Sequence, residues 1–157
     1  MSPDGKKALF SGLLPRIAGA CSRPEPAGAR LGSVCALLRD SVPWYDWVGF
    51  YVMDGAGREL VLGPFSGEPT EHVRIPVGRG ICGQAAARGE TCLANDVSLE
   101  KNYLSCSARV KSEIVVPVYR DGRIVGEIDV DSHSAAPFGV EDRAFLEEVA
   151  DIAAGLL

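Results

Sequence analysis

Two of the five cysteines in this chain stand in positions that suit thiol chemistry. The odd cysteine count, with no CxxC pair and no zinc-type spacing, argues against a disulfide framework or a zinc finger. Cys106 falls in an irregular polar stretch, where a cysteine is less expected to be buried. Cys82 falls in the first turn of an Ala-rich predicted helix, where backbone N–H groups and the helix dipole favour thiolate if the side chain points toward them. Cys106 and Cys82 are therefore the candidate reactive thiols.

A second candidate group is a run of alternating carboxylates near the C-terminal end of the chain. Glu127, Asp129 and Asp131 alternate with Ile128 and Val130, so a strand would place all three acids on one face. Such a face is usually solvated. Aspartate is a poor strand former, however, and two aspartates at the end of an otherwise good strand indicate a function.

The spacing of apolar residues predicts the elements that position these groups. N-terminal helices are expected within about 7–40, a further helix at 81–88, and a C-terminal amphipathic helix through Phe145 and Leu156. Strands are expected at 47–53, 59–62, 72–75, 92–94, 113–119 and 123–130. Residues 95–111 lack periodicity and are expected to form a long loop, of the kind that often carries function. Because hairpins join the strands, the order predicts an α+β fold with an antiparallel sheet and helices packed on one face.

Two details of the strands decide which side chains share a face. In the strand at 47–53, Trp47, Gly49 and Tyr51 form an aromatic face opposite the aliphatic one. Asp121 and Gly122 predict a type I′ hairpin turn. A strict two-residue turn would point Glu113 away from the aspartates, whereas a three-residue loop, or a bulge, which Pro117 favours, would place it on their side.

Composition sets the class of protein and of partner. With 157 residues, 46% of them hydrophobic, the chain is long enough for one domain with its own core. A net charge of -5 argues against nucleic acid or an anionic membrane as partner. No segment has the composition of a membrane span or a signal peptide, so we expect a cytoplasmic protein.

Four segments, taken in order, resemble the free methionine-(R)-sulfoxide reductases, which are stand-alone GAF-domain enzymes. The likeness extends from about 47 to 145 and is carried by WVGFY at 47–51, LVLGPFSG at 60–67, VRIPVGRGICG at 73–83, and SEIVVP at 112–117 with IDVDS at 128–132. The resemblance implies a GAF-like fold, a six-stranded antiparallel sheet flanked by helices. It implies one GAF domain over 1–157, with N-terminal helices at about 7–40 and the core at about 44–157, often as a homodimer.

The resemblance also implies roles for particular residues. The cysteine of the long loop, Cys106, matches the nucleophile, and Cys82 matches a cysteine that can act as the resolving thiol. The resemblance implies substrate binding by Trp47 and by the carboxylates Glu113, Asp129 and Asp131. Tyr51 and Glu127, which share strand faces with these residues, complete the expected substrate-binding set.

These residue types suit the implied reaction. A thiolate attacks the sulfoxide sulfur, methionine leaves, and a second thiol captures the resulting sulfenic acid as a disulfide that thioredoxin reduces. Carboxylates would hold the ammonium group of a free amino acid, while Trp47 offers its ring to the S-methyl end. Such a pocket would reject peptide-bound methionine, and the reaction needs no cofactor.

The chain departs from the family pattern at three positions, which leaves two alternatives open. His72 stands where the family has another resolving cysteine, Ser107 follows the nucleophile in place of aspartate, and Glu127 replaces an apolar residue. One alternative is a metal-dependent enzyme in which His72, Cys82 and Cys106 bind a transition metal such as zinc, copper or iron. The other is a GAF module that binds a small molecule without catalysis.

Overall fold

The computed structural model describes residues 1–104 and 107–157. Its helices are α1 (Pro3–Cys21), α2 (Ala27–Ser41), α3 (Gly80–Arg88) and α4 (Val140–Ala153), with short 3-10 turns η1 (Val97–Leu99) and η2 (Ala154–Leu156). Its strands are β1 (Trp47–Met53), β2 (Glu59–Ser66), β3 (Arg74–Pro76), β4 (Cys92–Ala94), β5 (Ser112–Arg120) and β6 (Arg123–Ser132). Each expected element is present, with bounds shifted by a few residues.

The strands form one six-stranded sheet in the order β3-β2-β1-β6-β5-β4. Every neighbouring pair in it is antiparallel. The expected α+β fold with a six-stranded antiparallel sheet is therefore confirmed. The first and last pairs of long strands, β1–β2 and β5–β6, are hairpins, while β6 joins β1 at the centre of the sheet although the two are far apart in sequence.

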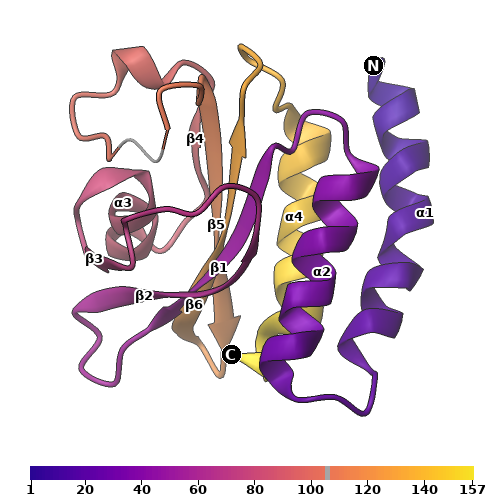
Figure 1. The fold of residues 1–157 in the computed structure, drawn as a ribbon, viewed down its shortest axis with the longest axis horizontal. Coiled ribbons are helices and arrows are strands. Elements are labelled where there is room, and N and C mark those ends of the chain that lie inside the picture. The colour runs from indigo at the N-terminus through magenta and orange to yellow at the C-terminus, as the bar shows by residue number, and fades with distance from the viewer. Residues whose placement is uncertain (105–106) are drawn as a thin grey trace.

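Helices cover both faces of the sheet, which corrects the expectation that they pack on one face only. Figure 1 shows α2 and α4 on one side, with α1 outside them, and α3 on the opposite side. The sheet thus separates a larger core beneath α1, α2 and α4 from a smaller one beneath α3. Apart from Ile81, the residues that α3 buries have short side chains or none, such as Cys82, Gly83 and Ala85, so the smaller core leaves room for polar groups of the sheet.

The first helix starts four residues earlier than the apolar spacing indicates. Ser2 Oγ accepts a hydrogen bond from the Gly5 amide at 3.1 Å, and Pro3 occupies the first turn, where its missing N–H has no partner to lose. The cap, rather than the apolar face, sets this boundary. Across the described helices, none combines the length and apolar content needed to cross a membrane.

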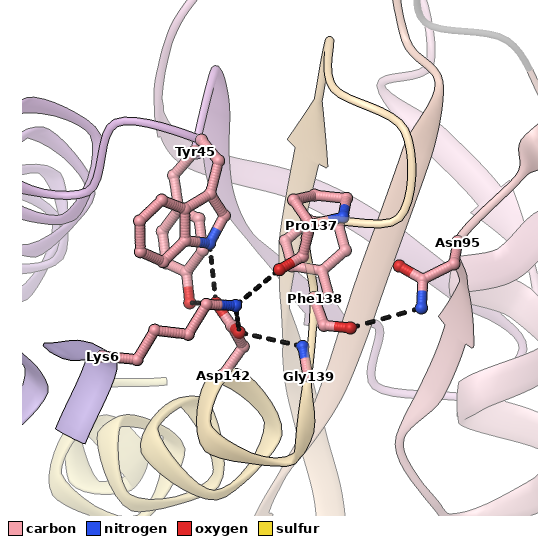
Figure 2. Close-up of polar contacts among 8 residues, drawn as sticks. Lys6, Tyr45, Asn95, Pro137, Phe138, Gly139 and Asp142 are labelled. Carbon is pink, nitrogen blue, oxygen red and sulfur yellow. Dashed lines mark hydrogen bonds and ion pairs between the residues drawn. The ribbon is translucent and has the colours of Figure 1, made fainter. Parts of the chain in front are cut away.

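A buried ion pair fixes α1 to the start of α4 (Figure 2). Asp142 is fully buried and accepts hydrogen bonds from Lys6 Nζ at 2.5 Å and Trp44 Nε1 at 2.7 Å. Tyr45 Oη and the Gly139 amide donate to the same carboxylate at 3.1 and 2.9 Å. One carboxylate therefore joins α1, the segment before β1, and α4.

Replacing Asp142 by asparagine is expected to lower the free energy of unfolding by about 3–5 kcal/mol, because it leaves the buried Lys6 ammonium without its counter-charge. Urea unfolding measures this loss. Asp151→Asn, an exposed change on the same helix, is the matched control and should stay within about 0.5 kcal/mol of the parent. Equal stability of the two variants would show that the ion pair does not hold α1 in place.

Candidate functional site

The candidate site is a grid of side chains on the α3 face of the sheet, where β1, β6 and β5 run side by side. Directly paired residues of antiparallel strands point to the same face. One row holds Trp47, Asp131 and Glu113. The next holds Gly49, Asp129 and Val115, and the third holds Tyr51, Glu127 and Pro117. All six expected substrate-binding residues therefore lie together on one surface.

A β-bulge places Glu113 on this face. The β5–β6 pairing shifts between Val118, which faces Gly126, and Tyr119, which faces Ile124, so that Val125 is the extra residue. The turn itself has two residues, with positive φ at Asp121 and Gly122, as expected for type I′. Of the alternatives that the sequence left open, the bulge is the one found, and it brings Glu113 opposite Asp131.

Two glycines make room for the Trp47 ring. A Cβ on Gly49 would lie 2.3 Å from the indole, and one on Gly67, whose φ is +137°, would lie 2.5 Å from it. The ring stacks on Phe65 with centroids 5.5 Å apart, and Nε1 donates to the Glu68 carbonyl at 2.9 Å. Trp47 is therefore held flat along β1 at the end of the acidic grid.

Cys82 points from α3 into the carboxylates, not toward the helix N-terminus. Its thiol donates to Glu113 Oε1 at 3.8 Å. Burial, and after it the charges of Asp129, Glu127, Glu113 and Asp131, raise the pKa of Cys82 well above its usual value. The conditional expectation that the helix terminus favours a thiolate here is thus wrong, because the side chain faces negative charge in a dry environment.

The four carboxylates are crowded and almost completely buried. Glu113 is 5% exposed and the other three are 1% exposed or less. Burial, followed by the Asp129 charge, raises the pKa of Glu113, Glu127 and Asp131. Burial also raises the pKa of Asp129, to about 6, although hydrogen bonds from Glu113 and Cys82 act against it. Asp129 is therefore the acid of the cluster that ionises most readily.

These acids have no protein cation to neutralise them in the described part of the chain. None of the ion pairs found there involves Glu113, Glu127, Asp129 or Asp131. Both oxygens of Glu127 and of Asp131, and one of Asp129, lack a hydrogen-bond donor among the described residues. Buried carboxylates without donors are costly, and a cationic ligand would supply both the charge and the donors that they lack.

The raised pKa of Asp129 predicts that the stability of the unliganded protein decreases as the pH rises. The folded state binds this proton more tightly than the unfolded state does, so the stabilisation is complete below about pH 4 and is lost as the pH rises through about 6. We expect Asp129→Asn to gain roughly 3 kcal/mol on the parent between pH 4 and pH 7. Urea unfolding across this range measures the gain, with exposed Asp40→Asn as control. A difference in unfolding free energy between Asp129→Asn and the parent that does not change with pH would show that burial does not raise the Asp129 pKa.

A cavity of about 280 Å³ opens beside the first row of the grid. Asp131, 1% exposed, and Trp47, 5% exposed, are buried parts of its wall. The rest of the wall contains both basic and acidic side chains. It includes Arg39, Asp46, Glu68, Ser107, Arg109 and His133. Its size suits a single small molecule with both a cationic and an anionic group.

The structure places the remaining expected residues as follows. Tyr51 is fully buried, and its hydroxyl donates to the His72 carbonyl at 2.9 Å, so it positions the segment before β3. Cys106 lies outside the described residues, and Ser107, which follows it, lines the cavity. Within residues 1–104 and 107–157, the donor atoms close enough to share a metal are those of Cys82, Glu113 and Asp129, and His72 is not among them.

Sequence reasoning missed the basic residues that line the cavity. Arg109 forms an ion pair with Glu68, another lining residue, and the pair links the segment after Cys106 to the segment after β2. His133, expected to be a surface loop residue, lines the cavity and pairs with Asp46 at 3.5 Å. A usable signal was the position of Arg109, three residues after Cys106 in the loop expected to be functional.

Comparison with known proteins identifies the family. The family model described as "GAF domain" matches residues 30–157. The chain belongs to the GAF domain family. This GAF protein is 38% identical over 149 residues to GAF domain-containing protein A of Dictyostelium discoideum, covering 95% of this chain and 92% of that protein.

Two further relatives bear the name expected from the sequence. Free methionine-R-sulfoxide reductase of Escherichia coli is 39% identical over 121 residues, 77% of this chain and 72% of that enzyme. The crystal structure of free methionine-R-sulfoxide reductase from Neisseria meningitidis in complex with its substrate is 39% identical, with a TM-score of 0.90 over 99% of this chain and 92% of that one. The resemblance to this group of oxidoreductases is confirmed.

Proposed function

We propose that this GAF domain reduces free L-methionine (R)-sulfoxide by thiol chemistry. The observation that carries the proposal is the buried group of Glu113, Asp129 and Asp131 beside Trp47. Both oxygens of Asp131 and one of Asp129 lack a donor among the described residues, and no ion pair there neutralises the group. An ammonium group supplies the positive charge and the N–H donors that these oxygens lack. The relatives named for this reaction support the choice of substrate.

The cavity suits both ends of a free amino acid. The ammonium group would bind at Asp131 and the paired Glu113, and the α-carboxylate would face Arg109 or Arg39, the two arginines that line the cavity. The Trp47 ring offers an apolar surface for the S-methyl group. A peptide-bound methionine has no ammonium group, so its amide would leave the carboxylates unsatisfied.

The reaction then follows two thiol steps. The Cys106 thiolate attacks the sulfoxide sulfur, the sulfoxide oxygen takes up one proton and passes to Cys106 as a sulfenic acid, and methionine leaves as the neutral thioether. Cys82 next attacks the Cys106 sulfenic acid, a disulfide forms, and the thiol proton departs with the hydroxyl as water. Because the Cys82 thiol is buried and its pKa is raised, an adjacent carboxylate such as Asp129 is suited to relay that proton from the thiol to the leaving hydroxyl. Thioredoxin is the proposed reductant of the disulfide; a homodimer and a cytoplasmic location also stay predictions.

Blocking the amine tests this function directly. We expect kcat/KM to fall by about 10²-fold or more from free methionine (R)-sulfoxide to its N-acetyl derivative, because the buried carboxylates would lose their counter-charge. Turnover is followed by methionine release with excess dithiol as reductant. Comparable turnover of both sulfoxides would refute the proposed role of the carboxylates.

A further inference from the structure

We infer that Cys82, Glu113 and Asp129 form a binding site for a thiophilic divalent cation of the zinc type, with Glu127 as an adjacent source of negative charge. This site goes beyond the reductase function and rests on the donor atoms alone. Only the competition with methionine described below depends on the proposed function. The set differs from the His72, Cys82 and Cys106 combination that the sequence suggested.

The donor atoms have the spacing that a small metal ion requires. One atom from each of Cys82, Glu113 and Asp129 lies within 4.8 Å of the other two. The Cys82 Sγ to Glu113 Oε1 distance is 3.8 Å. Zinc bonds of about 2.3 Å to sulfur and 2.0–2.2 Å to oxygen give a tetrahedral S···O edge of about 3.6 Å. The observed separation therefore needs only a small adjustment to bring both atoms onto one ion.

An independent observation points to a cation at this place. Glu127 lies fully buried one row beyond Asp129 on the same face, and both of its oxygens lack a donor among the described residues. Its register opposite Tyr51 sets it next to Asp129 on the α3 face of the sheet, where the Cys82 thiol also points. Binding of the substrate ammonium group accounts for Glu113, Asp129 and Asp131 but gives Glu127 no role. A divalent ion would offset this additional negative charge.

The donor types select the class of metal. A thiolate excludes the hard cations magnesium and calcium in favour of zinc-like ions, and carboxylate oxygens are ordinary zinc ligands. Binding converts the Cys82 thiol to a metal-bound thiolate and releases its proton to solvent. Asp131, which lines the cavity, is paired with Glu113 across β5 and β6 and so lies next to the site.

Direct metal titration tests the inference on the reduced, untagged full chain. Cd²⁺ serves as the probe because its bond to a thiolate gives an ultraviolet charge-transfer band, and equilibrium dialysis with elemental analysis gives the stoichiometry. We expect one tightly bound ion per chain with the band, unchanged in Cys21→Ser and Cys106→Ser. Cys82→Ser should lose the band and bind about 10²-fold more weakly, and Glu127→Gln about 10-fold more weakly. Zn²⁺ should displace the cadmium.

Several outcomes would overturn the site. They are the absence of a tight ion, a band that persists in Cys82→Ser but disappears in Cys106→Ser, and equal affinity of Glu127→Gln and the parent. Should Cys82→Ser fail to fold, protection of Cys82 from alkylation by bound Zn²⁺ in the parent chain gives the same decision. Protection at Cys21 alone would count against the site.

Competition separates this inference from the proposed function. L-Methionine, through its ammonium group, should raise the apparent dissociation constant for Cd²⁺ in proportion to its concentration, whereas N-acetyl-methionine should not. Tight Cys82-dependent binding without sulfoxide turnover in chelator would leave the metal site standing and remove the reductase. Turnover in chelator without any Cys82-dependent metal binding would remove the metal site and leave the reductase function standing.

Discussion

Replacing Glu113 by glutamine is expected to lower kcat/KM for free methionine (R)-sulfoxide by about 10²- to 10³-fold. The side chain lies opposite Asp131 and beside Cys82, and it is 5% exposed. Glutamine keeps the shape but cannot take the negative charge that a buried ammonium group requires, and removing one partner of a buried ion pair costs about 3–5 kcal/mol. Steady-state kinetics with dithiol as reductant measures the loss.

Two comparisons make the Glu113 result specific. Glu90→Gln, an exposed change just after α3, should match the parent enzyme. Thermal unfolding should show that Glu113→Gln is folded and no less stable, because it removes a strained buried acid. A Glu113→Gln variant with parental kcat/KM would remove this carboxylate from substrate binding.

The second large effect is expected from Cys82→Ser, which should separate the two thiol steps. Steady-state turnover with thioredoxin should fall by at least about 10²-fold, because the sulfenic acid at Cys106 has lost the thiol that converts it to a disulfide. A single turnover should persist and release close to one methionine per chain. Rapid quenching of a stoichiometric mixture measures that release, and a sulfenic-acid probe should label the product.

The matched control for Cys82→Ser is Cys21→Ser, a half-buried cysteine of α1 on the other side of the sheet. Cys21→Ser should retain both the single turnover and the steady-state turnover with thioredoxin. If Cys82→Ser turned over with thioredoxin at the parental rate, the resolving thiol would lie elsewhere, and half-buried Cys92 of β4 would be the next candidate.

Strand periodicity was sufficient to predict most of the site. The alternation of Trp47, Gly49 and Tyr51, and that of Glu127, Asp129 and Asp131, fixes which side chains share a face. Pairing of β1 with β6 then brings the two sets together. The face of Glu113 could not be decided, because it depends on one extra residue in the hairpin, and a bulge at Val125 inverts the parity.

The electrostatics of Cys82 lay beyond local reasoning for a different reason. A helix terminus acts along the chain and is visible in sequence, whereas the acids that raise the Cys82 pKa come from β5 and β6, across the smaller core. The basic residues that line the cavity were missed for the same reason, because Arg109 meets Glu68 only in the folded chain. Contacts between distant segments, not local preferences, set the chemistry of the site.

The decisive measurement is NADPH consumption in a thioredoxin-coupled assay with free L-methionine (R)-sulfoxide, run on the parent chain and on Cys106→Ser. Steady turnover is expected from the parent and none from the variant, with both proteins folded. Turnover that survives in Cys106→Ser, or a folded parent that consumes no NADPH with active thioredoxin, would refute sulfoxide reduction by Cys106.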